Sequence, residues 1–318
     1  MDDVPCITVV TGPLGAGKTT LLNRWLGAFE RGEVAVIVNE FGDVGVDGEL
    51  LSERVKELVE LTGGCVCCTT QADLVRALLD LSARDPAPRR VFIETSGAAS
   101  PAGVVRSLTR GAVSRRMRLD GVVTALDATR LERLRESLLV AEQAAYADVI
   151  VLTRAESVTD EARASMLATV ARHNPAAAIA WSSRGSLVDA SITDLDALLA
   201  RRADDFAAPW VIMRGDAPSH EPGIESVSLT LDGAVDGDRF SEWVESLADR
   251  YGGRLMRVKG IVAVEGVAER VLLQGVADVI EVSMASPWGD ATPRSRVVFI
   301  GYGLDRASLE AGFAECAV

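Results

Sequence analysis

The sequence is poor in lysine, histidine and aromatic residues. It has 318 residues, of which two are histidines. Lysine occurs only as Lys18, Lys56 and Lys259. Phe, Trp and Tyr together make up 5% of the chain, so we expect Val, Leu, Ile and Ala to fill the core. Because lysine is so rare, a lysine at a position that a motif requires is not expected by chance.

Long apolar segments and an excess of positive charge are also absent. The chain has no run of about 20 apolar residues, so no membrane-spanning helix is predicted. Residues 1–5 lack the basic and apolar segments of a signal peptide, and we expect a cytoplasmic protein. The net charge of −13 argues against nucleic acids and anionic membranes as partners. Composition is otherwise that of a globular protein, and the length suggests two domains.

The five cysteines are distributed unevenly. Cys65, Cys67 and Cys68 fall within four positions, whereas Cys6 and Cys316 stand alone. An odd, clustered set in a chain without export signals argues against a disulfide framework and for a cytosolic thiol or metal role. For the two isolated cysteines we expect a packing role. No internal repeat or low-complexity segment is present.

Residues 12–19 fit the phosphate-binding pattern G-x-x-x-x-G-K-[ST] at every fixed position. A β-branched apolar run at 6–10 precedes them, and a helical pattern beginning at Thr20 follows. Glycine lets the backbone wrap closely around an anion, and the loop and helix N–H groups then point at the phosphates. Lysine at this place reaches the β- and γ-phosphates, and the following hydroxyl binds Mg²⁺. The predicted nucleotide-binding residues of this segment are Gly12, Pro13, Leu14, Gly15, Ala16, Gly17, Lys18, Thr19 and Thr20.

The region from residue 6 to about 181 alternates between strand and helix patterns. Helices are predicted at 71–83, 101–110, 129–145 and 159–172. This alternation predicts an α/β fold, a P-loop NTPase domain with a mainly parallel sheet covered on both faces. Ligands of such sheets lie at the carboxyl ends of the strands. Further strands are predicted at 34–38, 55–61, 90–94, 121–127, 148–153 and 177–181.

The alternation stops between 201 and 223, where Pro and Gly become frequent. We therefore predict a first domain over 1–207, a linker over 208–223 and a small α+β domain over 224–318. In this second domain the predicted elements follow the order strand, helix, several strands and helix. That order is typical of a sheet with helices on one of its faces. The predicted strands are 224–231, 254–264, 270–274, 278–284 and 297–300, and the helices are 238–250 and 305–316.

Polar segments follow two predicted strands near the phosphate loop. Residues 39–47 form a glycine-interrupted loop that contains Glu40. The polar residues and glycines of this loop are those of an ordinary turn, which is one interpretation. Because the loop would lie beside the phosphate loop, the other interpretation is a switch that senses the γ-phosphate. The strand at 90–94 ends in Glu94, which can act on Mg²⁺ through water, and Gly97 can offer its N–H to the γ-phosphate.

The cysteine cluster has the chemistry of a metal site. Thiolates bind Zn²⁺ and related ions strongly, and the preceding Gly63 and Gly64 permit the sharp turn that three ligands require. A tetrahedral ion needs a fourth ligand, for which water, a partner's group and a carboxylate are candidates; Glu40 is the candidate carboxylate. A vicinal disulfide with a redox role and simple packing of free cysteines are the alternatives.

Together these motifs resemble the CobW family, whose members are P-loop GTPases acting as metal chaperones or metallocentre insertases. The resemblance implies that Thr153, Arg154 and Glu156 form the base-recognition motif, although the family usually has Asn-Lys-x-Asp or Thr-Lys-x-Asp there. Glu156 keeps a carboxylate for the two guanine N–H donors, and Arg154 keeps the charge without being equivalent to lysine. The histidine-rich run of many members is absent. Further matches are Asn174-Pro175 and residues 147–153, 257–262 and 296–301.

The resemblance predicts a GTPase that couples nucleotide state to the binding and delivery of Zn²⁺ or Co²⁺. Expected partners are GTP, GDP and a client metalloprotein or metal-dependent enzyme, with the C-terminal domain docking the client or another copy of the chain. Slow basal turnover is expected, because the sequence contains no evident catalytic arginine. A nucleotide-gated scaffold with a structural zinc, and a thiol-redox regulator, are the alternative functions.

Overall fold

The computed structural model describes residues 4–30, 32–39, 58–60, 69–188, 195, 199, 223–277 and 279–318. The chain separates into two compact units, Met1–Thr169 with Ala177–Asp205, and Val170–Ala176 with Phe206–Val318. The predicted switch and the cysteine cluster lie outside the described residues, as does the predicted linker up to residue 222. No helix in the described ranges is both long and apolar enough to cross a membrane.

The first unit contains an eight-stranded sheet in the order β3-β2-β4-β1-β5-β6-β7-β8. All neighbours from β3 to β7 pair in parallel, and only the short β8 runs antiparallel to β7. The predicted α/β fold class is confirmed. The strands are β1 (Cys6–Thr11), β2 (Val34–Asn39), β3 (Leu58–Glu60), β4 (Arg90–Thr95), β5 (Arg118–Asp127), β6 (Val149–Thr153), β7 (Ala178–Ser183) and β8 (Ser186–Leu187).

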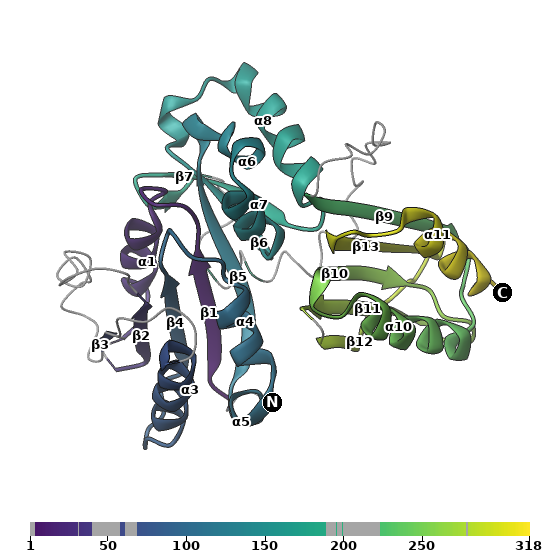
Figure 1. Cartoon of the computed structure of the whole chain (residues 1–318), viewed down its shortest axis with the longest axis horizontal. Helices are drawn as coiled ribbons and strands as arrows, with labels where there is room; N and C mark the ends of the chain where they lie inside the picture. The colour runs from purple at the N-terminus through teal and green to yellow at the C-terminus, as the bar shows by residue number, and fades with distance from the viewer. Residues whose placement is uncertain are drawn as a thin grey trace. The chain divides into compact units, whose positions relative to one another are not determined.

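Helices cover both faces of this sheet (Figure 1). On one face, α1 (Lys18–Leu26) packs Leu22 and its other apolar residues against Val123 and Ala125 of β5. Because side chains alternate along a strand, Thr124 points to the other face. There its hydroxyl donates to the Gln143 carbonyl of α7 (Leu138–Ala145) at 2.7 Å. The remaining helices are α3 (Thr69–Ser82), α4 (Ala102–Thr109), α5 (Gly111–Ser114), α6 (Arg133–Glu136) and α8 (Asp160–His173), with 3-10 turns η1 (Ala128–Arg130) and η2 (Ala155–Ser157).

The single helix predicted over 129–145 is wrong. The structure divides it into η1, α6 and α7, with a break at Ser137. Ser137 adopts an extended conformation (φ −130°, ψ 113°), and its hydroxyl accepts a hydrogen bond from the Val140 N–H. Serine competes for backbone hydrogen bonds in this way and therefore caps a new helix rather than continuing the old one.

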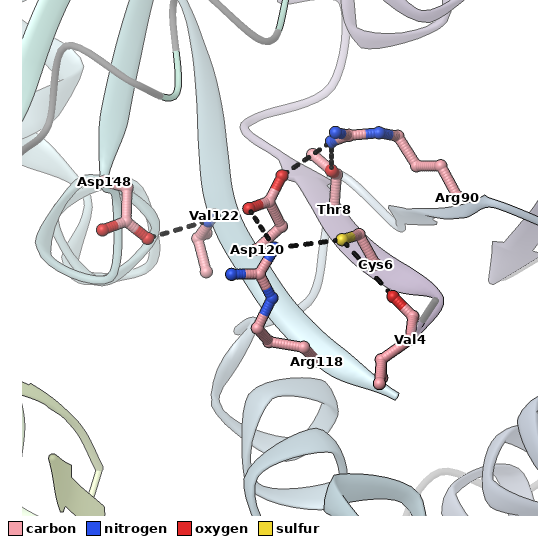
Figure 2. A network of polar contacts seen from close by, with 8 residues as sticks. All are labelled: Val4, Cys6, Thr8, Arg90, Arg118, Asp120, Val122 and Asp148. Carbon is pink, nitrogen blue, oxygen red and sulfur yellow. Dashed lines mark hydrogen bonds and ion pairs between the residues drawn. The ribbon is translucent and has the colours of Figure 1, made fainter. Parts of the chain in front are cut away.

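A polar network ties the amino ends of the central strands together (Figure 2). Arg90 of β4 reaches across β1, where it donates to the Thr8 hydroxyl at 2.7 Å and to Asp120 of β5 at 2.8 Å. Arg118 of β5 donates to the Cys6 sulfur at 3.2 Å. The Arg90–Asp120 pair is largely buried, with side chains 9% and 13% exposed. This end of the sheet therefore stabilises the strand order, while the opposite end carries the phosphate loop.

The second unit is a five-stranded antiparallel sheet in the order β12-β11-β10-β13-β9. Helices α10 (Gly237–Tyr251) and α11 (Arg306–Glu315) pack on one face, as predicted, in a core that contains Phe240, Phe299 and Phe313. Cys316 is buried in this core, and burial raises the pKa of its thiol, which fits the expected packing role. The other elements are β9 (Ile224–Asp232), η4 (Gly252–Arg254), β10 (Leu255–Val262), β11 (Glu269–Val276), β12 (Val279–Pro287) and β13 (Arg294–Tyr302).

The buried ion pair gives a stability prediction. Asp120→Asn should lower the free energy of unfolding by about 1.5–3 kcal/mol, because the Arg90 guanidinium would lose a charge-assisted hydrogen bond in a nearly dry site. Urea denaturation followed by circular dichroism measures this change. The control is Asp80→Asn on the exposed side of α3, which should change the free energy by less than about 0.5 kcal/mol. Equal stability of the two variants would contradict a stabilising role for the pair.

Candidate nucleotide-binding site

The predicted phosphate loop connects β1 to α1 at the carboxyl edge of the sheet. Gly12, Gly15 and Gly17 all have positive φ angles, of 133°, 74° and 89°. This region of conformational space is open to glycine and strained for most other residues. At Gly12 a Cβ atom would also overlap the Ala125 carbonyl oxygen of β5. The glycine pattern of the motif is therefore required by the loop's shape and by its close contact with the neighbouring strand.

Thr19 and Glu94 meet at the base of the loop. β1 and β4 are neighbours in the sheet, with Val10 opposite Glu94, so Glu94 lies beside the start of α1. The Thr19 hydroxyl donates to Glu94 Oε1 at 2.8 Å. Lys18 is 7% exposed, and its ammonium group donates to the Pro13 carbonyl at 3.4 Å. The two oxygen atoms of Thr19 and Glu94 are ligands of the kind that Mg²⁺ prefers. The ammonium group of Lys18 beside them is suited to binding phosphate.

The segment after β4 packs directly on the loop. A Cβ atom on Gly97 would lie 2.5 Å from the Leu14 nitrogen, so only glycine fits there. Gln143 of α7 is completely buried and donates to the carbonyls of Gly97 and Ala99 at 3.4 and 3.1 Å. Sequence reasoning did not find Gln143. The available signal was a lone amide in an otherwise mostly apolar helix, which commonly marks a tertiary hydrogen bond.

The end of β6 holds the loop from the other side. The Thr153 hydroxyl donates to the carbonyl of Ala16 at 2.9 Å. Arg154 has a left-handed backbone (φ 59°) and lies over the loop, donating to the Gly15 carbonyl at 3.4 Å. Its guanidinium also pairs with Asp127 of β5 at 3.1 Å. The Asp127 side chain is only 6% exposed, and no sequence motif had singled it out. Its ion pair with Arg154 joins the end of β5 to the residue that follows β6.

Glu156 lies in η2, just beyond Arg154, with its carboxylate in solvent. Its pKa is below the ordinary value for glutamate. The largest cause is a hydrogen bond from its own backbone N–H, followed by a hydrogen bond from the Ser183 side chain. The positive charges of Arg184 and Arg154 lower the pKa further. Glu156 is therefore an ionised hydrogen-bond acceptor at neutral pH.

A cavity of about 440 Å³ joins these groups, a volume typical of small-molecule sites. It brings together most of the predicted residues, whereas Gly12, Pro13 and Gly97 lie outside its wall. Arg184 and Gly185 also line it, although no motif in the sequence singled them out. The lining residues are Leu14, Gly15, Ala16, Gly17, Lys18, Thr19, Thr20, Leu21, Glu94, Thr153, Arg154, Glu156, Arg184 and Gly185.

The predicted metal ligands Glu40, Cys65, Cys67 and Cys68 all lie outside the described residues. Within the described ranges, no group of three or more His, Cys, Asp or Glu residues could hold a metal ion. Cys6 and Cys316 are free thiols in different units. The metal site at the cysteine cluster stays a prediction.

Comparison with known protein families accounts for both units. The model of the CobW/HypB/UreG nucleotide-binding domain matches residues 6–180, and that of the cobalamin synthesis protein CobW C-terminal domain matches residues 224–317. The chain belongs to the CobW family. The predicted resemblance is thereby confirmed, and the first unit is a P-loop NTPase domain.

Relatives cover nearly the whole chain. The zinc chaperone YjiA of Escherichia coli is 33% identical over 97% of both chains. The zinc chaperone CobW of Pseudomonas aeruginosa is 31% identical over 95% of this chain and 89% of its own. The crystal structure of the Zn(II)-bound YjiA GTPase from E. coli is similar to this structure with a TM-score of 0.68 and 26% identity, and it covers 99% of both chains.

The close approach of Gly97 to the loop gives a second prediction. Gly97→Ala should weaken the binding of a fluorescent GTP analogue by roughly 5- to 150-fold, because the added methyl group forces apart two segments at a cost of about 1–3 kcal/mol. Fluorescence titration measures the affinity. Gly253→Ala is the control, since a Cβ atom there meets nothing within 4 Å. Unchanged affinity in the Gly97 variant would show that this contact does not shape the site.

Proposed function

We propose that this protein is a GTP-hydrolysing metallochaperone that couples its nucleotide state to the binding of Zn²⁺ and its delivery to a client metalloprotein. The observation that carries the proposal is the single cavity in which the phosphate loop, the Thr19–Glu94 pair and the ionised Glu156 lie together. Its volume and its polar groups suit a nucleoside triphosphate. Relatives that are named zinc chaperones and match over nearly the whole chain support Zn²⁺ as the cargo.

The phosphate end follows from the loop. Its N–H groups and the N-terminus of α1 bind the phosphates, and Lys18 moves from the Pro13 carbonyl to the β- and γ-phosphates. Mg²⁺, when bound, offsets the negative charge of these phosphates. Thr19 holds it through the side-chain hydroxyl, which already lies beside a carboxylate oxygen of Glu94. Glu94 orients the attacking water or a water on the metal, and Gly97 offers its N–H to the γ-phosphate.

The base end is Glu156. An ionised carboxylate accepts hydrogen bonds from guanine N1–H and from the exocyclic amino group, a donor pair that adenine lacks. The position of Glu156 beside Arg154, which contacts the loop at Gly15, supports this assignment. Discrimination follows because adenine would leave the carboxylate without its partners.

The metal-binding residues are proposed from the sequence alone. Cys65, Cys67 and Cys68 bind the transferred ion, and Glu40 completes the site when GTP orders the switch. Hydrolysis then loosens the site and releases the ion to the client. We further propose that the C-terminal unit docks the client or a second copy of the chain. The cytoplasmic location stays a prediction.

Removing the loop lysine tests the GTPase. Lys18→Ala should abolish measurable GTP hydrolysis and leave the melting temperature unchanged, because the variant lacks the charge that stabilises the transferred phosphoryl group. Phosphate release measures turnover. Arg76→Ala removes a positive charge from the exposed side of α3 and should hydrolyse GTP at the wild-type rate. A Lys18 variant as active as the wild type would show that the phosphate-loop assignment is wrong.

Nucleotide and metal should be coupled. The Zn²⁺ dissociation constant should be roughly 5- to 150-fold lower with a non-hydrolysable GTP analogue than with GDP, and Zn²⁺ must tighten binding of the analogue by the same factor. Serine at Cys65, Cys67 and Cys68 should abolish tight Zn²⁺ binding and this coupling, while Cys6→Ser serves as the control. Identical Zn²⁺ constants in the two nucleotide states would eliminate the coupled mechanism.

Chelation and mild oxidation separate the alternative functions. A structural zinc should be needed for folding, so its chelation should unfold the protein, whereas a cargo ion should leave a folded chain. A thiol-redox regulator should instead form a reversible disulfide within the cysteine cluster. Mass spectrometry under mild oxidation detects that bond.

A further inference from the structure

One wall of the cavity is a hairpin turn that joins β7 to β8. Ser183 and Ser186 pair across it, and Arg184 and Gly185 form the two-residue connection. Their φ angles are both positive, at 50° and 83°, which is the pattern of a type I′ turn. Asn, Asp and Gly usually occupy its first central position, because they tolerate the left-handed conformation. An arginine held there is unfavourable for the backbone, and such residues concentrate at functional sites.

The turn is fixed against the first turn of α1. A Cβ atom on Gly185 would lie 2.8 Å from the Thr20 carbonyl oxygen and 3.1 Å from the Thr20 methyl group. Backbone therefore contacts backbone at this point, one residue beyond the Thr19 hydroxyl. This contact sets the distance between Arg184 and the phosphate loop.

The Arg184 side chain is exposed and lines the same cavity as Glu156. Among the described residues, none forms a hydrogen bond or ion pair with its guanidinium. Its charge nevertheless acts on the Glu156 carboxylate, which also receives the Ser183 hydrogen bond. Residues 183 and 184 of the turn thus flank the acceptor proposed for guanine, and the donors of Arg184 remain available to a ligand.

We propose that Arg184 is a specificity-determining residue that reads guanine by donating to the O6 and N7 atoms of the base. This inference rests on the proposed function, in which Glu156 accepts the hydrogen bonds from N1–H and the 2-amino group. The forked guanidinium matches the O6 and N7 acceptors of guanine and commonly binds both at once. O6 is attached to the ring carbon next to N1, so the residues that bind these two atoms must lie close together, and Glu156 and Arg184 line the same cavity.

The two side chains together present donors and acceptors in the order that guanine requires. Adenine keeps the N7 acceptor but carries an amino donor at position 6, which would face the donors of Arg184. It also presents an acceptor at N1 to the carboxylate of Glu156. Adenine would therefore meet a like group at two positions, a donor at Arg184 and an acceptor at Glu156. The preference for guanine over adenine should be stronger than Glu156 alone would give.

Binding of nucleoside diphosphates to the full chain tests the proposal, because hydrolysis does not interfere. The probes are GDP, 7-deaza-GDP, which lacks the N7 acceptor, IDP, which lacks the 2-amino group, and ADP. Arg184→Asn removes the guanidinium with a residue that tolerates the left-handed turn. Arg184→Lys keeps the charge but not the fork. Arg76→Gln, on the exposed side of α3, controls for the change in net charge, and melting temperatures report folding.

We expect the wild type to bind 7-deaza-GDP more weakly than GDP. Arg184→Asn should bind GDP roughly 5- to 150-fold more weakly than the wild type, the range for one bidentate contact to a base. Arg184→Asn should lose most of the difference between GDP and 7-deaza-GDP, whereas Arg184→Lys, which can still donate to N7, should keep part of it. They should keep the preference for GDP over IDP, because Glu156 is intact.

Two results would overturn the inference: a wild type that binds GDP and 7-deaza-GDP equally, or an Arg184→Asn variant that keeps the wild-type difference. Arg184→Gly, which also suits the left-handed turn, provides the same test if the asparagine variant does not fold. The proposed function fails separately, through equal binding of GDP and ADP by the wild type or through undiminished hydrolysis by Lys18→Ala.

Discussion

Close backbone packing around the phosphate loop is the constraint on which the site depends. At three places the chain approaches so closely that no Cβ atom fits. Gly12 lies against the Ala125 carbonyl of β5, Gly97 against Leu14 of the loop, and Gly185 against Thr20 of α1. These contacts come from a central strand, from the segment after β4 and from the β7–β8 turn. The parallel sheet brings all of them to its carboxyl edge, and their steric fit sets the loop's position.

Hydrogen bonds to its carbonyl groups also hold the phosphate loop in place. Thr153 donates to Ala16, Arg154 to Gly15 and Lys18 to Pro13. Thr153 and Arg154 each engage the negative end of a peptide dipole, which would otherwise repel a bound phosphate. Thr153 and Arg154 therefore act on the electrostatics of the loop, and Glu156 is the member of the motif that we propose contacts the base.

The sequence predicted the fold class and the loop because periodicity and glycine spacing are local signals. It did not predict the break at Ser137, where one side-chain cap competes with helix continuation. Gln143 and Asp127 were also missed, since their partners depend on how α7 and β5 pack against distant segments. The β7–β8 turn lacks the Asn-Gly signal of tight hairpins, so Arg184 was not identified. The switch and the cysteine cluster lie outside the described residues and stay predictions.

The proposed base motif departs from the usual one at two positions, Arg154 and Glu156. Arginine is longer than lysine and ends in a fork, and Arg154 uses that fork to reach Asp127 and the Gly15 carbonyl together. Glutamate carries one more methylene than aspartate and so has more rotational freedom to lose on binding. Hydrogen bonds from its own N–H and from Ser183 lower the pKa of Glu156, which favours the ionised carboxylate. Both residues thus keep the charges expected of the proposed motif, and Arg154 is held by β5 and by the phosphate loop.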